Sequence, residues 1–240
     1  VLTLATSYTD TVGNAGPSAT TANFTIDTAA PTVSSFTLSD SALKSGETAT
    51  VTIEFSEAVT GFASDDVTAS NGSLSTMTSS DNITWTGTYT PTAGIEDDSN
   101  VLTLATSYTD TVGNAGPSAT TANFTIDTAA PTLSEQTVVS TPSNDTTPSV
   151  VISSNEAGTI TSSLGFTSTT SGISGDNTIT FATLSAGTYT PTVTFTDASG
   201  NESTVTLTSF VIDTAAPTLS EDTVVSTPSN DTTPSVVISS

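Results

Sequence analysis

The chain has 240 residues and a formal net charge of −23, because 24 acidic side chains face one basic residue, Lys44. A chain this acidic repels nucleic acid phosphates and anionic membrane surfaces, so neither is expected as a partner. Cysteine is absent, which excludes disulfides and thiolate metal sites.

The acidic balance has two interpretations. Carboxylates in loops suit Ca²⁺, a hard cation that prefers oxygen ligands. Alternatively, the charge only keeps a crowded surface protein soluble. No run of residues approaches the roughly 18 apolar positions of a membrane-spanning helix, so we expect no direct membrane insertion by this segment.

Threonine and serine dominate the polar residues, and apolar residues make up 34% of the chain. Such a composition could indicate disorder. Threonine, however, is β-branched and suits strands, whereas disordered chains favour Pro, Glu, Lys and Gln. We therefore expect ordered β-structure with thin cores.

Internal repeats define the organisation of the chain. Residues 1–32 recur unchanged at 101–132, and residues 126–154 recur at 212–240 with one difference, Gln136 against Asp222. The motif Ile-Asp-Thr-Ala-Ala-Pro-Thr begins at each boundary between the resulting segments, at Ile26, Ile126 and Ile212. The repeats predict a tail (1–28), two complete domains (29–128 and 129–214) and a head (215–240).

The tail and the head are each expected to supply about two strands, too few to close a sandwich. In the order of a seven-stranded sandwich these are strands F and G in the tail and strands A and B in the head. We expect the sequence to start and stop within domains of a longer chain. The alternative is that like chains complete the fragments head to tail and build a fibre.

Apolar residues alternate with polar ones along the predicted strands, and helical periodicity is absent. This pattern places one face on a core and the other in water. Leu184 to Tyr189 predicts a tyrosine corner, and Trp85 is interpreted as a core residue rather than a sugar-stacking platform. The predicted inward positions are Val51, Ile53, Phe55, Ile83, Trp85, Tyr89, Val193, Phe195, Val205 and Leu207.

Four motifs together resemble a known family. They are Phe55-Ser-Glu-Ala-Val59, Tyr108-Thr-Asp-Thr-Val-Gly-Asn114, Phe195-Thr-Asp-Ala-Ser-Gly-Asn201 and the Asp-Thr-Ala-Ala-Pro linkers. The combination is similar to bacterial immunoglobulin-like repeats, which build the extender regions of biofilm-associated proteins and large repetitive adhesins. The resemblance implies an all-β chain of tandem immunoglobulin-like antiparallel β-sandwiches, about seven strands each, stacked end to end. It also implies an extracellular location on a bacterial cell surface and, as in many members, Ca²⁺ at domain junctions.

The topology of such a sandwich gathers acidic loops at its poles, because the BC and FG loops lie beside the linker that enters strand A. In the first domain this predicts a cluster of Asp27, Glu57, Asp65, Asp66, Asp110 and Asn114, with Glu96, Asp97 and Asp98 at the opposite pole near the outgoing linker. In the second domain the matching residues are Asp127, Glu156, Asp197, Asn201 and Glu202. Further candidates are Asp10 and Asn14 in the tail and Asp213 in the third linker.

These residues are predicted ligands of structural Ca²⁺, which takes about six to eight oxygens. Without a cation, carboxylates this close repel each other within the screening length of about 8 Å. The alternative is turn chemistry alone, because Asp followed by Gly-Asn is also a hairpin signal, and no EF-hand spacing is present. Glu57 and Glu156, which no turn requires, favour Ca²⁺.

Enzymatic activity is not expected, because a chain without His, Cys or Arg has few groups for acid–base or nucleophilic catalysis. The favoured function is a structural extender rigidified by Ca²⁺, with short Ala-Ala-Pro linkers and neighbouring domains of the same chain as partners. The alternatives are a ligand-binding adhesin module for a glycan or matrix protein, and a subunit of a strand-complemented filament.

Overall fold

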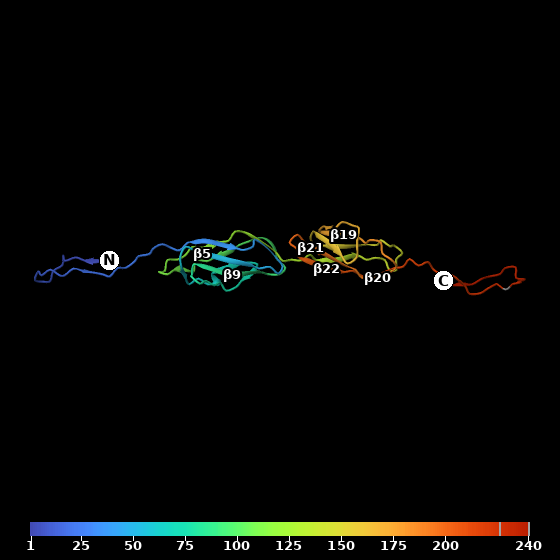
Figure 1. Ribbon diagram of the computed structural model, residues 1–240, viewed down its shortest axis with the longest axis horizontal. Coiled ribbons are helices and arrows are strands. Elements are labelled where there is room, and N and C mark those ends of the chain that lie inside the picture. Colours follow the sequence, from blue (N-terminus) through green and yellow to red (C-terminus); the bar gives the residue numbers. More distant parts are fainter. Residues whose placement is uncertain (226, 240) are drawn as a thin grey trace. The chain divides into compact units, whose positions relative to one another are not determined.

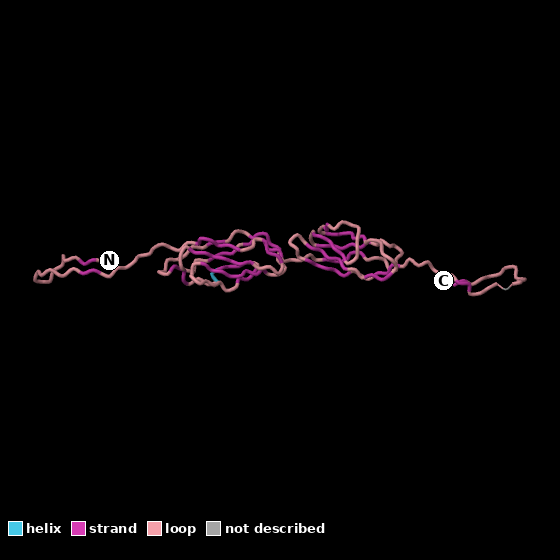
Figure 2. The backbone as a smooth tube through the Cα atoms, in the orientation of Figure 1, coloured by secondary structure: helices cyan, strands magenta, loops and turns pink. Residues whose placement is uncertain are grey.

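Alternating apolar and polar residues become short β-strands along most of the computed structural model, which describes residues 1–225 and 227–239. Two units are distinguished, Val1–Ile126 and Asp127–Ser240. Strands separated by loops dominate both, and a 3₁₀ turn, η1 (Ser64–Asp66), is the helical element among the described residues (Figures 1 and 2). Ser226 and Ser240, both in the predicted head, lie outside those residues.

The first layer of unit 1 is an antiparallel sheet in the order β3-β5-β9-β8. Central strand β5 pairs with β9 beside it (Figure 1), so that Ile53 lies opposite Trp85. Alternation confirms the predicted inward face of β5: Val51, Ile53 and Phe55 are at most 1% exposed. The bounds are β3 (Val33–Leu38), β5 (Ala49–Phe55), β8 (Gly72–Leu74) and β9 (Thr84–Pro91).

Shorter strands form the second layer of unit 1, in the orders β10-β14-β4, β13-β11-β7 and β12-β6. Aromatic contacts join the two layers: Phe55 packs on Tyr108 at 4.8 Å between ring centroids, and Tyr89 on Phe124 at 5.4 Å. The bounds are β4 (Ala42–Lys44), β6 (Val59–Thr60), β7 (Val67–Ala69), β10 (Glu96–Asn100), β11 (Leu102–Leu104), β12 (Thr109–Asp110), β13 (Ala119–Thr120) and β14 (Phe124–Asp127).

The strands of unit 1 are more interrupted than the expected seven, because turns break them. Gly61, Asn71 and Gly94 adopt positive φ between strands, a conformation that glycine and asparagine tolerate best. Trp85 is half-buried and packs against the edge of the core, where its ring meets Phe62. Its interpretation as a residue packed on the core therefore agrees with the structure.

Unit 2 also packs two layers on one core. Sheet β15-β16-β19 faces sheet β18-β17-β21-β22 and the pair β20-β23, with Ile152, Val193 and Phe195 fully buried between them. The Tyr189 hydroxyl donates to the Ser185 carbonyl at 2.9 Å, which confirms the predicted tyrosine corner. The bounds are β15 (Leu133–Thr137), β16 (Ser149–Ser154), β17 (Gly158–Ser162), β18 (Ser171–Gly172), β19 (Gly175–Thr180), β20 (Gly187–Tyr189), β21 (Thr192–Thr196), β22 (Glu202–Thr206) and β23 (Phe210–Ile212).

Each end of the chain forms a two-stranded pair. In the tail, β1 (Thr3–Leu4) pairs with β2 (Ala19–Thr20) in the same register that β11 and β13 use in unit 1. In the head, β24 (Ser220–Glu221) pairs with β25 (Ile238–Ser239). Apolar side chains of both pairs are exposed, among them Leu4 at 53% and Ile238 at 60%. Two strands alone therefore leave these side chains uncovered.

Candidate calcium site

The FG loop of unit 1 is organised by one buried carboxylate, Asp110, which lies at the end of β12 and is 1% exposed. Its Oδ1 accepts hydrogen bonds from the backbone N–H groups of Val112, Gly113 and Asn114 at 2.7–2.9 Å. Its Oδ2 accepts one from the Asn114 side chain at 2.7 Å. The turn chemistry expected from Asp followed by Gly-Asn is therefore present, and it fixes the orientation of the carboxylate.

Asn114 also joins the FG loop to the incoming linker. Its Nδ2 donates to the carbonyl oxygens of Asp27 at 3.3 Å and Ala29 at 3.1 Å, besides its bond to Asp110. The Asp27 carboxylate in turn accepts from the Ala29 N–H at 3.0 Å. These contacts bring a residue 83 positions earlier in the chain next to Asp110, as the sandwich topology predicted.

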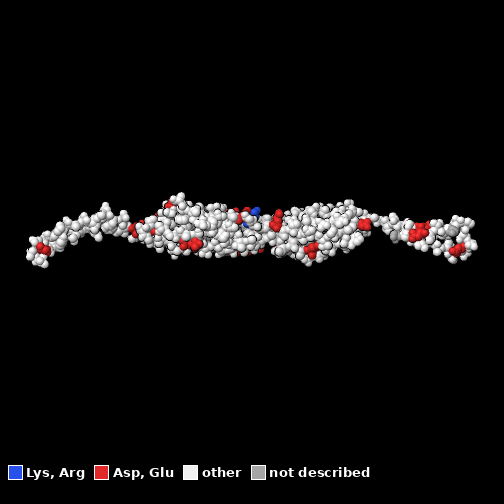
Figure 3. Space-filling view, turned by 90° about the horizontal axis from the view of Figure 1, so that it is seen from below, with Lys and Arg blue, Asp and Glu red and all other residues white. Residues whose placement is uncertain are grey.

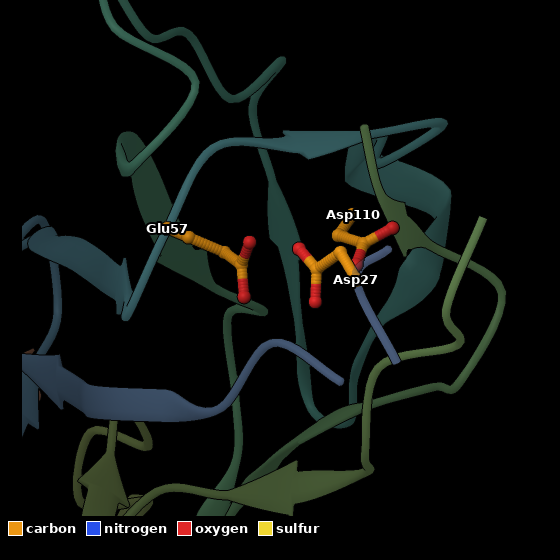
Figure 4. Close-up of side chains that lie close together, drawn as sticks. All are labelled: Asp27, Glu57 and Asp110. Atoms are coloured by element: carbon orange, nitrogen blue, oxygen red, sulfur yellow. The ribbon is translucent and has the colours of Figure 1, made fainter. Parts of the chain in front are cut away.

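Glu57 completes a group of three carboxylates. It lies in the turn between β5 and β6, and its side chain extends toward Asp27 and Asp110 (Figure 4). One carboxylate oxygen of each residue lies within 4.8 Å of the others. Asp27 is exposed, Glu57 half-buried and Asp110 buried. Three negative charges at such distances repel each other strongly, so this arrangement favours a cation.

The oxygen atoms present fit Ca²⁺. Asp110 Oδ1 is saturated by three N–H donors, but Oδ2 accepts only from Asn114. Glu57 contributes two oxygens and Asp27 at least one that is not bonded to Ala29. The set is therefore oxygen-only, multidentate and partly open to water, which is the environment that Ca²⁺ accepts and that softer metals do not prefer.

Unit 2 arranges the equivalent residues differently. Asn201 bonds to Asp197 as Asn114 does to Asp110, and both residues are buried. Its Nδ2, however, donates to the Asp127 carboxylate Oδ1 at 3.2 Å as well as to the Asp127 carbonyl at 3.0 Å. Glu156 is half-buried in the turn between β16 and β17, where its N–H donates to the Ser154 hydroxyl at 3.4 Å. Among the described residues, only Asp27, Glu57 and Asp110 form a group of three potential metal ligands.

The other predicted ligands lie in separate places. Asp66 bonds to the Ala63 N–H and to the Ser107 hydroxyl, and neighbouring Asp65 is exposed in η1. In the tail, Asp10 and Asn14 repeat the local bonds of Asp110 and Asn114. The remaining residues lie along β10, at the start of β22 and in the third linker, and they are Glu96, Asp97, Asp98, Glu202 and Asp213.

Acidic side chains gather in a few places on the surface shown in Figure 3, and most of that face is uncharged. The strand faces carry threonine and serine instead, as in Thr192, Thr194 and Thr196 of β21. Where carboxylates gather in loops, as Asp27, Glu57 and Asp110 do, their closeness suits cation binding better than a dispersed arrangement would.

Hydrogen bonding and burial have opposite effects on the pKa of the Asp110 carboxyl. Burial is the largest single effect and by itself would raise this pKa. The bonds from the Asn114 side chain and from the N–H groups of Asn114, Val112 and Gly113 together outweigh it, so the pKa is lowered from its usual 3.8. The ionised form therefore stabilises unit 1 fully above the unfolded pKa, and this contribution is lost as pH falls through the folded value.

Asp110→Asn is therefore expected to destabilise unit 1 at neutral pH, with a difference from wild type that shrinks as pH falls below about 4. Fluorescence of Trp85, the single tryptophan of the chain, reports the unfolding of unit 1. Asp10→Asn is the matched control, since it removes the same local bonds from the tail hairpin alone. A wild-type melting profile across pH for Asp110→Asn would contradict the role assigned to this carboxylate.

Comparison with known families identifies both units. Two family models, each described as a bacterial Ig-like domain, match residues 27–126 and 136–214. The chain is a tandem of bacterial Ig-like domains. The match confirms the family resemblance that the four sequence motifs indicated. It also agrees with the predicted fold of tandem all-β sandwiches. Among the described residues, no helix has the length and apolar character needed to cross a membrane.

Matches to individual proteins add little to this assignment. No curated protein matches the chain. Among solved structures, the chain matches dimeric latent PorU from Porphyromonas gingivalis at 14% identity and a TM-score of 0.27. The match covers 80% of this chain but only 25% of that one, so the chain spans a quarter of the length of PorU.

Sequence reasoning missed one polar cluster in the first Ig-like domain. Asn100 is 2% exposed, and its side chain donates to the carbonyls of Asp97 and Phe124 and accepts from Asn71. Asn71 also donates to the Asp97 carboxylate at 2.8 Å. The Asn71-Gly72 pair was a visible turn signal, but nothing in the sequence indicated which strand its side chain would meet.

Proposed function

We propose that this chain is a non-catalytic structural spacer of an extracellular bacterial surface protein, in which Ca²⁺ rigidifies the entry to the first Ig-like domain. Its partners would be further domains of the same kind along the chain. The observation that carries the proposal is the convergence of Asp27, Glu57 and Asp110 in a domain of this family. Long identical repeats support a spacer, since copying a whole module adds length more readily than it improves one binding site.

Each residue would have a distinct part. Asp110 is oriented by its four hydrogen bonds, Glu57 reaches in from the BC turn, and Asp27 belongs to the linker. When bound, Ca²⁺ would supply positive charge that offsets the repulsion among the three carboxylates. The linker, which already contacts Asn114 through two carbonyls and Ser56 through Thr32, would then also be held at the Asp27 carboxylate.

Hydrogen exchange of the linker amides tests this proposal. In millimolar Ca²⁺, amides of residues 27–32 are expected to exchange more slowly than in chelator, because the linker is held at Asp27. The third linker is an internal control: Asp213 accepts from the Ala215 N–H at 2.9 Å, much as Asp27 accepts from Ala29, but the described residues place no group of three carboxylates around it. Equal effects on both linkers, or none, would overturn the proposal.

A further inference from the structure

One turn of unit 1 combines a reactive dipeptide with a neighbourhood that is sensitive to charge. Asn71 is the one asparagine of the chain that precedes a glycine. It joins β7 to β8 with φ of 54°, and both Asn71 and Gly72 are partly accessible to water. Because glycine has no side chain to shield its nitrogen, an Asn-Gly amide nitrogen can approach the preceding side-chain carbonyl more easily than any other.

The β-ladder leaves this nitrogen out of its hydrogen bonds. The Thr92 N–H donates to the Asn71 carbonyl at 2.8 Å, which makes Gly72 and Pro91 a pair that is not hydrogen-bonded. The Gly72 N–H consequently points away from β9. The dipeptide is therefore held in a defined turn while its nucleophilic nitrogen takes no part in the pairing with that strand.

We propose that Asn71 is a site of spontaneous deamidation in the folded chain. The Gly72 nitrogen attacks the side-chain carbonyl carbon of Asn71, a new C–N bond forms, and ammonia leaves with the proton of the Gly72 amide. Water then opens the resulting five-membered imide at either carbonyl. The products are aspartate at position 71 or isoaspartate, whose backbone runs through the side chain. No other reactant is required.

The surroundings convert this change into a loss of stability. The Asn71 amide donates to the Asp97 carboxylate and to the Asn100 side-chain oxygen, each at 2.8 Å. A carboxylate at position 71 cannot donate to either, and it repels Asp97. Asn100 is 2% exposed, so water cannot easily replace the lost donor. Ageing of the chain in an extracellular setting would thus weaken unit 1 selectively.

Peptide mass spectrometry of the 240-residue chain, incubated folded in mildly alkaline buffer, tests the proposal. Asn71 is expected to lose its amide several-fold faster than Asn82, an internal control that shares positive φ but precedes Ile83. The aged chain should show a Tm of unit 1 lower by about 5–10 °C, read from Trp85 fluorescence. Asn71 surviving as long as Asn82 would overturn the proposal.

Two variants separate the causes of the expected instability. Asn71→Asp reproduces one product, whereas Asn71→Gly keeps the positive φ and removes the two hydrogen bonds without adding charge. Asn71→Gly should lower the Tm of unit 1 less than Asn71→Asp does. Should Asn71→Asp fail to fold, the deamidation rate of the wild-type chain still tests the proposed reaction. The Tm of Asn71→Gly then still measures what the two lost hydrogen bonds contribute to stability. An aged, deamidated chain with an unchanged Tm would show that the neighbourhood does not sense the charge.

Discussion

Gly116→Ala is expected to lower the Tm of unit 1 by about 5–20 °C, the shift that corresponds to an overpacking cost of about 1–3 kcal/mol in a domain of this size. A Cβ at position 116 would lie 2.1 Å from Tyr108 Cε2 and 2.3 Å from its Cζ. The ring cannot withdraw, because it is fully buried, its hydroxyl donates to the Pro117 carbonyl at 2.8 Å and it packs on Phe55.

The tail supplies a matched control for this substitution. Gly16 lies against Tyr8 in the same way, with a Cβ distance of 2.0 Å to Tyr8 Cε2, and the Tyr8 hydroxyl likewise donates to the Pro17 carbonyl at 2.9 Å. Tyr8 is 43% exposed, however, so its ring can shift into water at the loss of that one hydrogen bond. Gly16→Ala should leave the Trp85 unfolding transition unchanged. If Gly116→Ala and Gly16→Ala both melt like wild type, Tyr108 is not packed between the layers as described.

Millimolar Ca²⁺ is expected to raise the Tm of unit 1 by about 10–20 °C, provided that it is present at about 100 times its dissociation constant. Binding to the folded state alone would then contribute about 2.7 kcal/mol. The physical reason is the repulsion among Asp27, Glu57 and Asp110, which only a cation offsets, since Lys44 forms its ion pair with Glu47.

Glu57→Gln should remove most of this Ca²⁺-dependent rise in Tm. The substitution removes a negative charge that forms no part of a turn, while it keeps the shape of the side chain. Glu54→Gln is the matched control: Glu54 is exposed on the outer face of β5, opposite Thr84 in the ladder. A gain that persists in Glu57→Gln, or that disappears in Glu54→Gln, would place the cation elsewhere.

Alternation of apolar residues predicted many core positions, although Ile83, expected on an inward strand face, is half-buried in the bend before β9. Val51, Ile53 and Phe55, and likewise Val193 and Phe195, lie inside as expected because side chains on a strand alternate between its faces. Most breaks between strands were not predicted. An Asn-Gly pair such as Asn71-Gly72 is a turn signal, but a single glycine such as Gly61 marks a break only through the positive φ that it takes in the folded chain.

Burial itself depends on the rest of the domain. Leu4 and Leu104 belong to identical segments with identical hairpin pairing, yet Leu4 is 53% exposed and Leu104 fully buried. The difference is the cover provided by β7 and the facing sheet, which the tail hairpin lacks among the described residues. Local sequence determines the hairpin, and tertiary contacts determine its environment.

For the candidate site, sandwich topology predicted which loops would meet. It did not predict which side-chain oxygen atoms would lie close together and which would form hydrogen bonds elsewhere. It brought Asp27, Glu57 and Asp110 together in the structure. It could not foresee that Asp66 would bond to Ser107, or that Asn201 would donate to the Asp127 carboxylate where Asn114 reaches two carbonyls. Side-chain hydrogen bonds of this kind depend on distances that loop order does not specify.

The most direct test of Ca²⁺ binding by Asp27, Glu57 and Asp110 is calorimetric titration of the 240-residue chain with Ca²⁺, beside Glu57→Gln and Glu54→Gln. The expected result is saturable binding to wild type and to Glu54→Gln, with a strong loss of affinity in Glu57→Gln. Absence of saturable binding to the wild-type chain, or equal affinity in all three proteins, would contradict the site and leave a spacer whose FG turns are held by hydrogen bonds alone.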